Sequence, residues 1–282
     1  MRVKENEMIG IMAAAALASP QAQPSASTSA TAPVSDPAVA QQIAQASSIG
    51  SLLYAFDRAA WVSSDKLTAS IPKDQLPDSG GYIVEIAGGG ILHVTYYRGT
   101  AATSRAFFVA DVRDGKVIRH EVLAQPVALT GQQVGLARAR EVAAMRARER
   151  SYKPCTPAPF NTVVVPSRDN GPIAVYLLSA QQDPTTWPVG GNYRVIVAPD
   201  GKLLASRPYS VGCLNLTLPR LPAGAKPVGF MVSHLLDLVP TEIHVFASFS
   251  LHTPVFVITP DKRAWKVEGA TITPTDLPKN VR

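Results

Sequence analysis

Short apolar runs alternate with turn residues along most of the chain, and this pattern predicts β-hairpins. Asp-Gly and Gly-rich turns between apolar or β-branched runs are the strongest short-range hairpin signal. Four units fit it: residues 82–97, 107–122, 193–207 and 255–267, with turns at 88–90, 114–115, 200–201 and 261–262. We therefore expect four antiparallel hairpins.

Two segments carry helix signals instead. Asp36 followed by Pro37 is a favourable helix start, and the pattern predicts a helix from there to about residue 48. Residues 50–61 fit a helix and a strand equally well, so their conformation stays open. Residues 130–153 are rich in alanine and free of internal proline, with Thr130 as the expected N-cap and Pro154 after the end. They predict the clearest helix of the chain.

These elements indicate an α+β fold rich in antiparallel hairpins. The first half has a helix at its start and a basic helix at its end, whereas residues after 153 show only short apolar runs between Pro and Gly. We expect an N-terminal α+β domain over 36–153 and a mostly β domain over 154–282.

The segment 242–251 has a pattern that favours a strand but also admits a helix. Its apolar residues alternate with period two, and Val, Ile and Phe dominate, which favours a strand. Val245 and Phe249 would then face the core, with Phe249→Ala costing about 3–5 kcal/mol, and His244 would lie on the solvated face, where its loss costs little. The alternative is a helix, in which His244, Ser248 and His252 would share a face.

The N-terminus predicts export. Residues 1–22 have a short charged leader, an apolar stretch and small residues suited to signal-peptide cleavage after Ala18 or Ala22. The apolar stretch is about half of the ~20 residues that a membrane-spanning helix needs, so no transmembrane segment is expected. Residues 23–35 continue a Ser/Pro/Ala-rich stretch that begins at residue 19 and predicts a disordered linker. The expected location is periplasmic or secreted.

Cysteine use agrees with that location. The chain has two cysteines, Cys155 and Cys213, and an even count in an oxidising compartment predicts a disulfide. Closing so long a loop would stabilise the fold by about 4 kcal/mol.

The formal net charge is +6, and it is concentrated in the basic helix. Removal of the signal peptide takes away two basic and two acidic residues, so the mature charge is also +6. The arginines fall on several helix faces, which argues against nucleic-acid binding. Contact with an anionic envelope component stays open beside the alternative of a solvated linker helix. The basic residues are Arg138, Arg140, Arg146, Arg148, Arg150 and Lys153.

Candidate site residues are few. Glu242 and His244 would lie on one strand face, Trp187 stands in a loop-like stretch that could line a groove, and Tyr97 could contact a ligand at a strand end. The sequence indicates no cofactor. We expect an exported protein with a non-catalytic binding or interaction role. The alternative is a metal-dependent or acid/base hydrolase centred on His234, Glu242 and His244.

Overall fold

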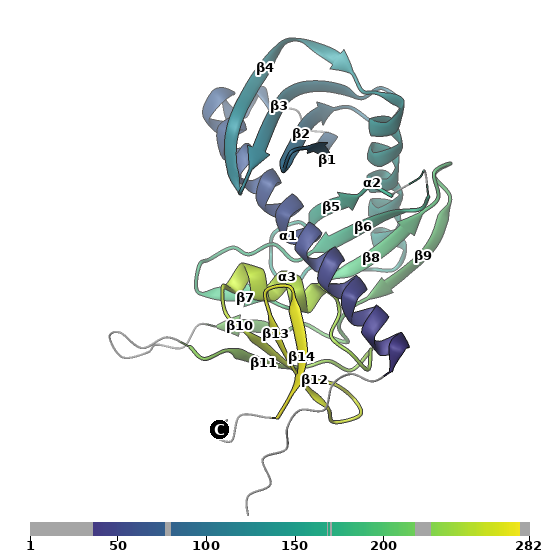
Figure 1. The fold of residues 1–282 in the computed structure, drawn as a ribbon. Helices are drawn as coiled ribbons and strands as arrows, with labels where there is room; N and C mark the ends of the chain where they lie inside the picture. The colour runs from purple at the N-terminus through teal and green to yellow at the C-terminus, as the bar shows by residue number, and fades with distance from the viewer. Residues whose placement is uncertain (1–35, 77–79, 168, 170, 218–226, 277–282) are drawn as a thin grey trace, which may run out of the picture. The chain divides into compact units, whose positions relative to one another are not determined.

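The computed structural model describes residues 36–76, 80–167, 169, 171–217 and 227–276. The expected signal peptide and linker lie outside these residues. Within them the chain forms three α-helices, a short 3-10 helix and fourteen strands (Figure 1), so the α+β prediction is confirmed. The helices are α1 (Pro37–Ser70), η1 (Lys73–Gln75), α2 (Gly131–Glu149) and α3 (Glu242–Leu251).

The strands form four sheets. The first has the order β1-β2-β3-β4, the second β5-β6-β8-β9, the third β10-β7 and the fourth β11-β12-β13-β14. All four predicted hairpins are present, as the pairs β1–β2, β3–β4, β8–β9 and β12–β13. The strands are β1 (Gly80–Gly88), β2 (Ile91–Arg98), β3 (Arg105–Arg113), β4 (Lys116–Ala128), β5 (Asn161–Val165), β6 (Ile173–Leu178), β7 (Thr186–Pro188), β8 (Tyr193–Val197), β9 (Leu203–Pro208), β10 (Asn215–Thr217), β11 (Phe230–Ser233), β12 (Val255–Ile258), β13 (Ala264–Glu268) and β14 (Thr271–Thr275).

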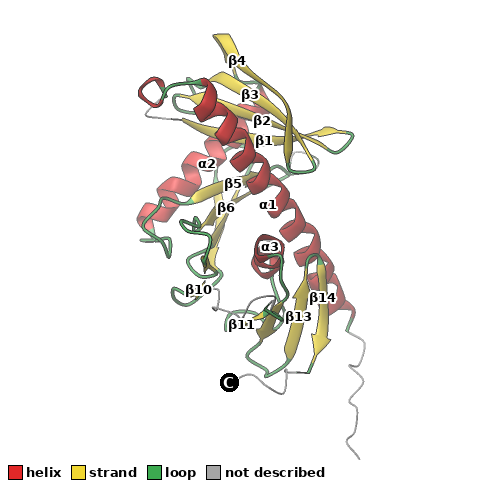
Figure 2. Cartoon of the chain, turned by 90° about the vertical axis from the view of Figure 1, so that its left-hand side faces the viewer, coloured by secondary structure: helices red, strands yellow, loops and turns green. Residues whose placement is uncertain are grey.

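Helix α1 begins where the sequence predicts and continues much further. The Asp36 side chain accepts a hydrogen bond from the Ala38 amide at 2.8 Å, which is the expected N-cap. The ambiguous residues 50–61 are helical, and α1 ends at Ser70. It packs against α3 and against strands of three sheets, and Figure 2 shows it running past them. This long contact explains why one helix continues through a segment with a weak periodicity.

Helix α2 confirms the predicted basic helix. Thr130 and Gln133 form a reciprocal capping box, in which each side chain accepts from the backbone amide of the other residue. The buried face of α2 consists of Leu136 and several alanines, which lie against β6, β8, β5 and β1. Small residues on this face let the helix approach the strands closely.

The strand prediction for 242–251 is wrong, because these residues form α3. Strands β11 and β12 pair in parallel, so the chain between them must cross back along the sheet, and a helix makes this crossover. Helix α3 packs on α1 as well as on β12 and β13, and apolar residues are therefore needed on more than one of its sides. A short buried helix and a strand cannot be separated by periodicity alone.

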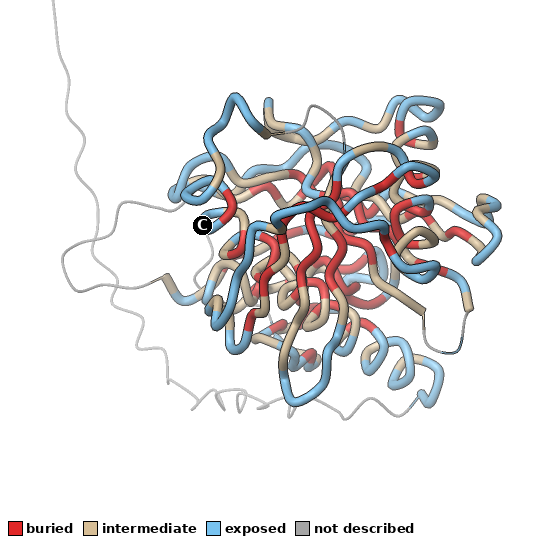
Figure 3. Tube along the Cα trace, turned by 90° about the horizontal axis from the view of Figure 1, so that it is seen from above, coloured by how far each residue is buried: buried red, intermediate tan, exposed pale blue. Residues whose placement is uncertain are grey.

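The buried residues, red in Figure 3, form three clusters. The first joins residues that are distant in sequence, among them Leu53, Phe108, Tyr176 and Ile243. It is assembled from α1, the first sheet, the second sheet and α3. The predicted boundary at residues 153 and 154 is not tested by this packing and stays a prediction.

The predicted disulfide is present. Cys155 and Cys213 are bonded, with their Cα atoms 5.3 Å apart. The bond joins the segment before β5 to the loop before β10, and the Asn215 side chain donates to the Cys155 carbonyl at 3.2 Å. Among the described helices, none is long and apolar enough to span a membrane.

Candidate functional site

A cavity of about 790 Å³ is lined by α1, α3 and residues of the first three sheets, and we call it the aromatic cavity. Its volume is within the range of about 300–1,000 Å³ that is typical of small-molecule sites. Its aromatic lining comes from five separate elements. The lining residues are Tyr54, Asp57, Arg58, Ala60, Trp61, Ser64, Tyr82, Tyr96, Asn161, Leu178, Ser179, Ala180, Gln181, Pro184, Trp187, Pro188, Phe246, Ser250, Leu251 and His252.

Helix α1 supplies one wall through its helical spacing. Tyr54, Asp57, Trp61 and Ser64 follow one another at intervals of three or four residues, so they share one face of the helix. The neighbouring face carries Leu53 and other residues that are buried in the first core cluster. Packing of that second face fixes the rotation of α1 and so turns the first face toward the cavity.

The aromatic walls are held in place by their own contacts. Tyr96 donates from its hydroxyl to the Ala60 carbonyl at 2.7 Å, and burial raises the pKa of this phenol to about 12. The Tyr82 and Tyr96 ring centroids lie 5.8 Å apart. Tyr54 stacks on Phe249 at 5.2 Å. These contacts indicate that the cavity is preformed.

Asp57 is a partly buried carboxylate in this lining. It accepts a hydrogen bond from the Asn161 side chain at 3.4 Å, which is long for a bond of this kind. Burial raises the pKa of Asp57 from 3.8 to about 6, and this effect outweighs the lowering by Asn161 and Arg58. Among the residues that the structure describes, no cation forms an ion pair with Asp57.

Two arginines near the cavity already lie over aromatic rings. The Arg58 guanidinium is 5.2 Å from the Trp61 ring centroid, and the Arg140 guanidinium is 5.1 Å from that of Tyr82. Arg140 also donates to the Thr162 carbonyl at 2.9 Å. Burial raises the pKa of Tyr82, and the negative charge of Asp57, which lines the same cavity, raises it further.

The predicted site residues fall in different places. Trp187 lies in β7, paired with Leu216 of β10, and lines the aromatic cavity. Tyr97 is buried in the second core cluster, away from the lining, whereas its neighbour Tyr96 lines the cavity. Side chains of adjacent strand residues point to opposite faces, which explains the difference. His252 caps α3 and is an exposed part of the lining.

Glu242 is buried, contrary to the solvated position that a strand predicted for it. Its Oε1 atom accepts hydrogen bonds from the Tyr176 hydroxyl at 2.9 Å, from Arg194 Nη1 at 3.0 Å and from the Tyr209 hydroxyl. These donors come from β6, β8 and the residue after β9. Burial, together with the nearby carboxylate, raises the pKa of both tyrosines. Glu242 thereby ties the start of α3 to the second sheet.

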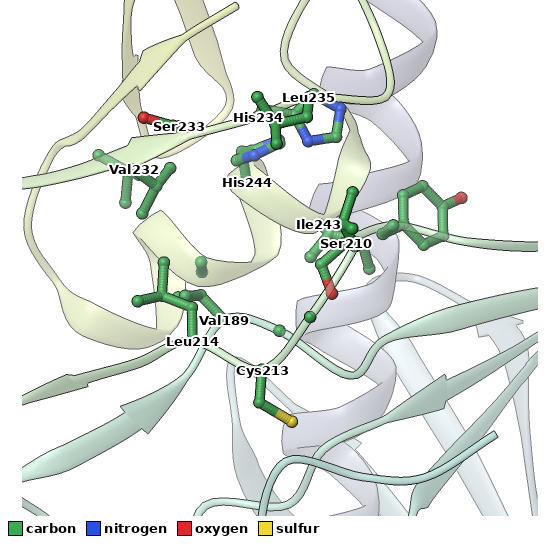
Figure 4. A pocket seen from close by; sticks show the side chains of 16 residues that line it. Val189, Ser210, Cys213, Leu214, Val232, Ser233, His234, Leu235, Ile243 and His244 are labelled. Atoms are coloured by element: carbon green, nitrogen blue, oxygen red, sulfur yellow. The ribbon is translucent and has the colours of Figure 1, made fainter.

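His234 and His244 lie together beside a smaller cavity of about 190 Å³ (Figure 4). Their ring centroids are 4.7 Å apart in an edge-to-face arrangement. His234 Nε2 is 2.8 Å from Asp237 Oδ2, and Arg207 donates to the same carboxylate. Burial acts to raise the pKa of Asp237, but the hydrogen bonds from His234 and Arg207 outweigh it and hold this pKa below its usual value.

His244 is held as a helix cap. Its Nδ1 atom accepts from the Thr241 amide at 3.0 Å, so the proton of the neutral ring is on Nε2. Burial, and next the charge of His234, lower the pKa of His244 to about 3. The solvated position predicted for His244 is therefore corrected to a partly buried one. Within the described residues, no group of three or more His, Cys, Asp or Glu side chains could hold a metal ion.

The basic helix uses part of its charge for packing. Besides Arg140, Arg146 turns inward and donates from Nε to the Ser206 hydroxyl at 2.9 Å. Arg138, Arg148 and Arg150 are exposed. Contact of these exposed arginines with an anionic envelope component stays a prediction.

No protein-family model matches this chain, and no curated protein matches it significantly.

Several lining residues were not singled out from the sequence, among them Tyr54, Asp57 and Asn161. The signal for the first two was present, since residues 54, 57, 61 and 64 recur at helical spacing. It could be used only once residues 50–61 were known to be helical. Asn161 carries no comparable local signal, because it reaches Asp57 through a contact between distant parts of the chain.

Proposed function

We propose that this chain is an exported, non-catalytic binding protein that holds a small organic ligand in the aromatic cavity. The observation that carries the proposal is the gathering of six aromatic side chains around one cavity of about 790 Å³. They are Tyr54, Trp61, Tyr82, Tyr96, Trp187 and Phe246. A concave site that is largely aromatic and contains a few polar groups is the usual form of a small-molecule site.

The polar groups of the lining support recognition of a specific ligand. Asp57, Asn161 and Gln181 offer a carboxylate and two amides within an otherwise aromatic surface. Trp61 is 55% exposed and lines the cavity, so its side chain is accessible to a ligand.

Export is part of this proposal. The leader pattern of residues 1–22 supports it, and so does the bond between Cys155 and Cys213, because disulfides persist mainly in oxidising compartments.

The geometry gives less support to a hydrolase centred on His234, Glu242 and His244. Three donors engage Glu242 Oε1, and the Thr241 amide engages Nδ1 of His244. A general base needs a lone pair that is free to take a proton from its substrate. A binding role therefore remains the better account of the molecule.

A substitution that fills the cavity tests the proposal. Ser64 lines the cavity from α1, and Ser64→Phe would place a ring inside it. We expect at least one member of a panel of neutral, cationic and anionic aromatic or branched organic compounds to raise the melting temperature of the purified chain by several degrees. The same compound should not raise the melting temperature of the Ser64→Phe variant.

Thr68→Phe is the matched control. Thr68 lies one helical turn further along α1 and is exposed. Its hydroxyl donates to a backbone carbonyl of the preceding turn, as the Ser64 hydroxyl does. Thr68 is not part of the cavity lining, so the same compound should raise the melting temperature of Thr68→Phe as much as that of the wild type. A panel that protects neither the wild type nor the control would refute the proposed function.

A further inference from the structure

Asp57 differs from the other sheltered carboxylates of the described chain. Six carboxylates are at least partly withdrawn from solvent: Asp57, Glu85, Asp111, Glu141, Asp237 and Glu242. Five of them have a hydrogen bond of 2.9 Å or shorter, to Gln133, His93, the Ala101 amide, His234 and Tyr176 respectively. For Asp57 the recorded partner is Asn161 at 3.4 Å.

A sheltered carboxylate without a close partner destabilises the folded protein, because burial removes water that would solvate its charge. The raised pKa of Asp57 reflects this cost. In the other five carboxylates the protein itself supplies the missing donor. Asp57 instead lines a cavity, where a ligand can supply it.

The surrounding rings favour a positive charge in the same place. Aromatic faces attract cations within about 6 Å of the ring centroid, and two rings of this lining already lie beside guanidinium groups. Trp187 and Phe246 also line the cavity, and within the described part of the chain neither has a recorded contact with another ring or with a cation. These two rings remain available to a ligand.

Arg58 does not neutralise Asp57, although it is the next residue. Its guanidinium lies over Trp61, and its aliphatic part extends toward Gly115 in the turn between β3 and β4. The two side chains form no ion pair. Arg58 therefore leaves the carboxylate open to the cavity.

We infer that the ligand of the aromatic cavity is an organic cation, an alkylammonium or quaternary ammonium compound whose charge lies between Asp57 and the aromatic rings. This inference rests on the proposed binding function and specifies the class of its ligand. The carboxylate supplies the opposite charge, and the rings supply cation–π contacts.

Binding of such a cation should depend on pH. The positive charge would favour the ionised carboxylate and so lower the pKa of Asp57 on binding. Arg58 is the next residue of α1, and Asn161 on β5 donates to Asp57. Tyr82 on β1 and His252 line the same cavity, and the Arg140 guanidinium lies over the Tyr82 ring. Guanidinium groups do not titrate in this pH range, and burial raises the pKa of Tyr82, so this phenol stays neutral. Because His252 also lines the cavity, Asp57→Asn is needed to assign proton release near pH 6 to Asp57.

Three probes of one shape and different charge test the inference. They are choline, its neutral isostere 3,3-dimethylbutan-1-ol, and the anion 3,3-dimethylbutanoate. We expect titration calorimetry or chemical-shift titration of the purified chain at pH 7 to show choline binding at least ten times more tightly than the other two. Calorimetry at pH 6 in buffers of different ionisation enthalpy should show proton release.

Variants connect the result to the carboxylate. Asp57→Asn should weaken choline binding at least tenfold and abolish proton release, while its circular dichroism shows that it is folded. Asp65→Asn removes an exposed carboxylate of the same helix outside the lining and should bind choline as the wild type does. Trp187→Leu should weaken choline binding without changing proton release per bound ligand.

The other outcomes separate this inference from the proposed function. Equal binding of choline and the neutral isostere, or tighter binding of the anion, would overturn the cationic ligand while leaving a binding cavity in place. Choline binding that Asp57→Asn does not weaken would also overturn it. Failure of the three probes together with the wider panel would refute the binding function itself.

Discussion

At the scale of single residues, Asp57 links the stability of the protein to the properties of its cavity. A sheltered carboxylate that the fold does not pair lowers stability, and proteins keep such groups most often where they serve a function. Glu242 shows the contrasting case, since its charge is engaged by two tyrosines and Arg194. Of these two acidic residues only Glu242 was a candidate site residue from the sequence, and in the structure it joins α3 to the second sheet.

The raised pKa of Asp57 predicts a pH-dependent stability. Between pH 4 and pH 6 the folded protein keeps a proton on Asp57 that the unfolded chain has lost, so this group contributes less stability as pH rises. Asp57→Asn removes the effect. Urea unfolding from pH 4 to pH 7 should show the unfolding free energy of the variant rising relative to that of the wild type as pH rises. The expected change is on the order of 1 kcal/mol, because the carboxylate is only partly buried. A difference that does not change with pH would contradict the raised pKa.

The helical state of 242–251 changes the expected effects of substituting His244 and Phe249. His244 caps α3 and packs on His234, while Phe249 is partly buried and stacks on Tyr54. We expect His244→Ala and Phe249→Ala to lower the unfolding free energy by similar amounts, about 1–2 kcal/mol each. His252→Asn is the control, because asparagine tolerates the left-handed conformation at this exposed cap. If Phe249→Ala alone lowered the unfolding free energy by about 4 kcal/mol, Phe249 would behave as the core residue that the sequence predicted.

At the scale of elements, the contact between α1 and α3 depends on one glycine. A Cβ atom at Gly50 would lie 2.5 Å from the Val245 Cβ and 2.6 Å from the Glu242 carbonyl oxygen. The two helices therefore approach more closely at this point than any other residue would allow. Glycine inside a helix normally costs about 1 kcal/mol, and here it is compensated by the packing of α3.

Two glycine substitutions separate packing from helix propensity. Gly50→Ala should lower the unfolding free energy by about 1–3 kcal/mol, because α3 must move to accept the methyl group. Gly135→Ala, in the interior of α2 with open space around it, should raise it by about 0.5–1 kcal/mol. Chemical denaturation of both variants measures the two effects. Stabilisation by both substitutions would mean that α1 and α3 do not meet at Gly50.

The elements predicted correctly are those with local signals. Asp-Gly turns identified the hairpins, and Thr130 with an uninterrupted run before Pro154 identified α2. The strand prediction for α3 was wrong for a physical reason. Apolar residues of α3 pack against α1 on one side and against the fourth sheet on another. The ambiguity at 50–61 has the same origin, since α1 is supported by several partners along its length.

At the scale of the whole molecule, the sequence could indicate the fold class, the disulfide and one residue of the cavity lining, Trp187. It could not indicate the cavity, because Tyr82, Asn161 and Phe246 come together only through the packing of α1 with two sheets and α3. Nor could it show that Asp57 lacks a close partner, since a missing contact has no sequence pattern. Features set by neighbouring residues could be predicted from the sequence, whereas contacts between distant residues could not.

The position of α1 also determines when the chain can fold. This helix contains the first described residues, yet its partners include α3 and β14, the last described strand. During synthesis β1 and β2 can pair as soon as both strands have emerged. The contact between Gly50 of α1 and Val245 of α3 can form only after α3 has been synthesised. Contacts so distant in sequence slow folding, and the apolar side chains of α1 stay exposed to association with other chains until the last sheet has formed.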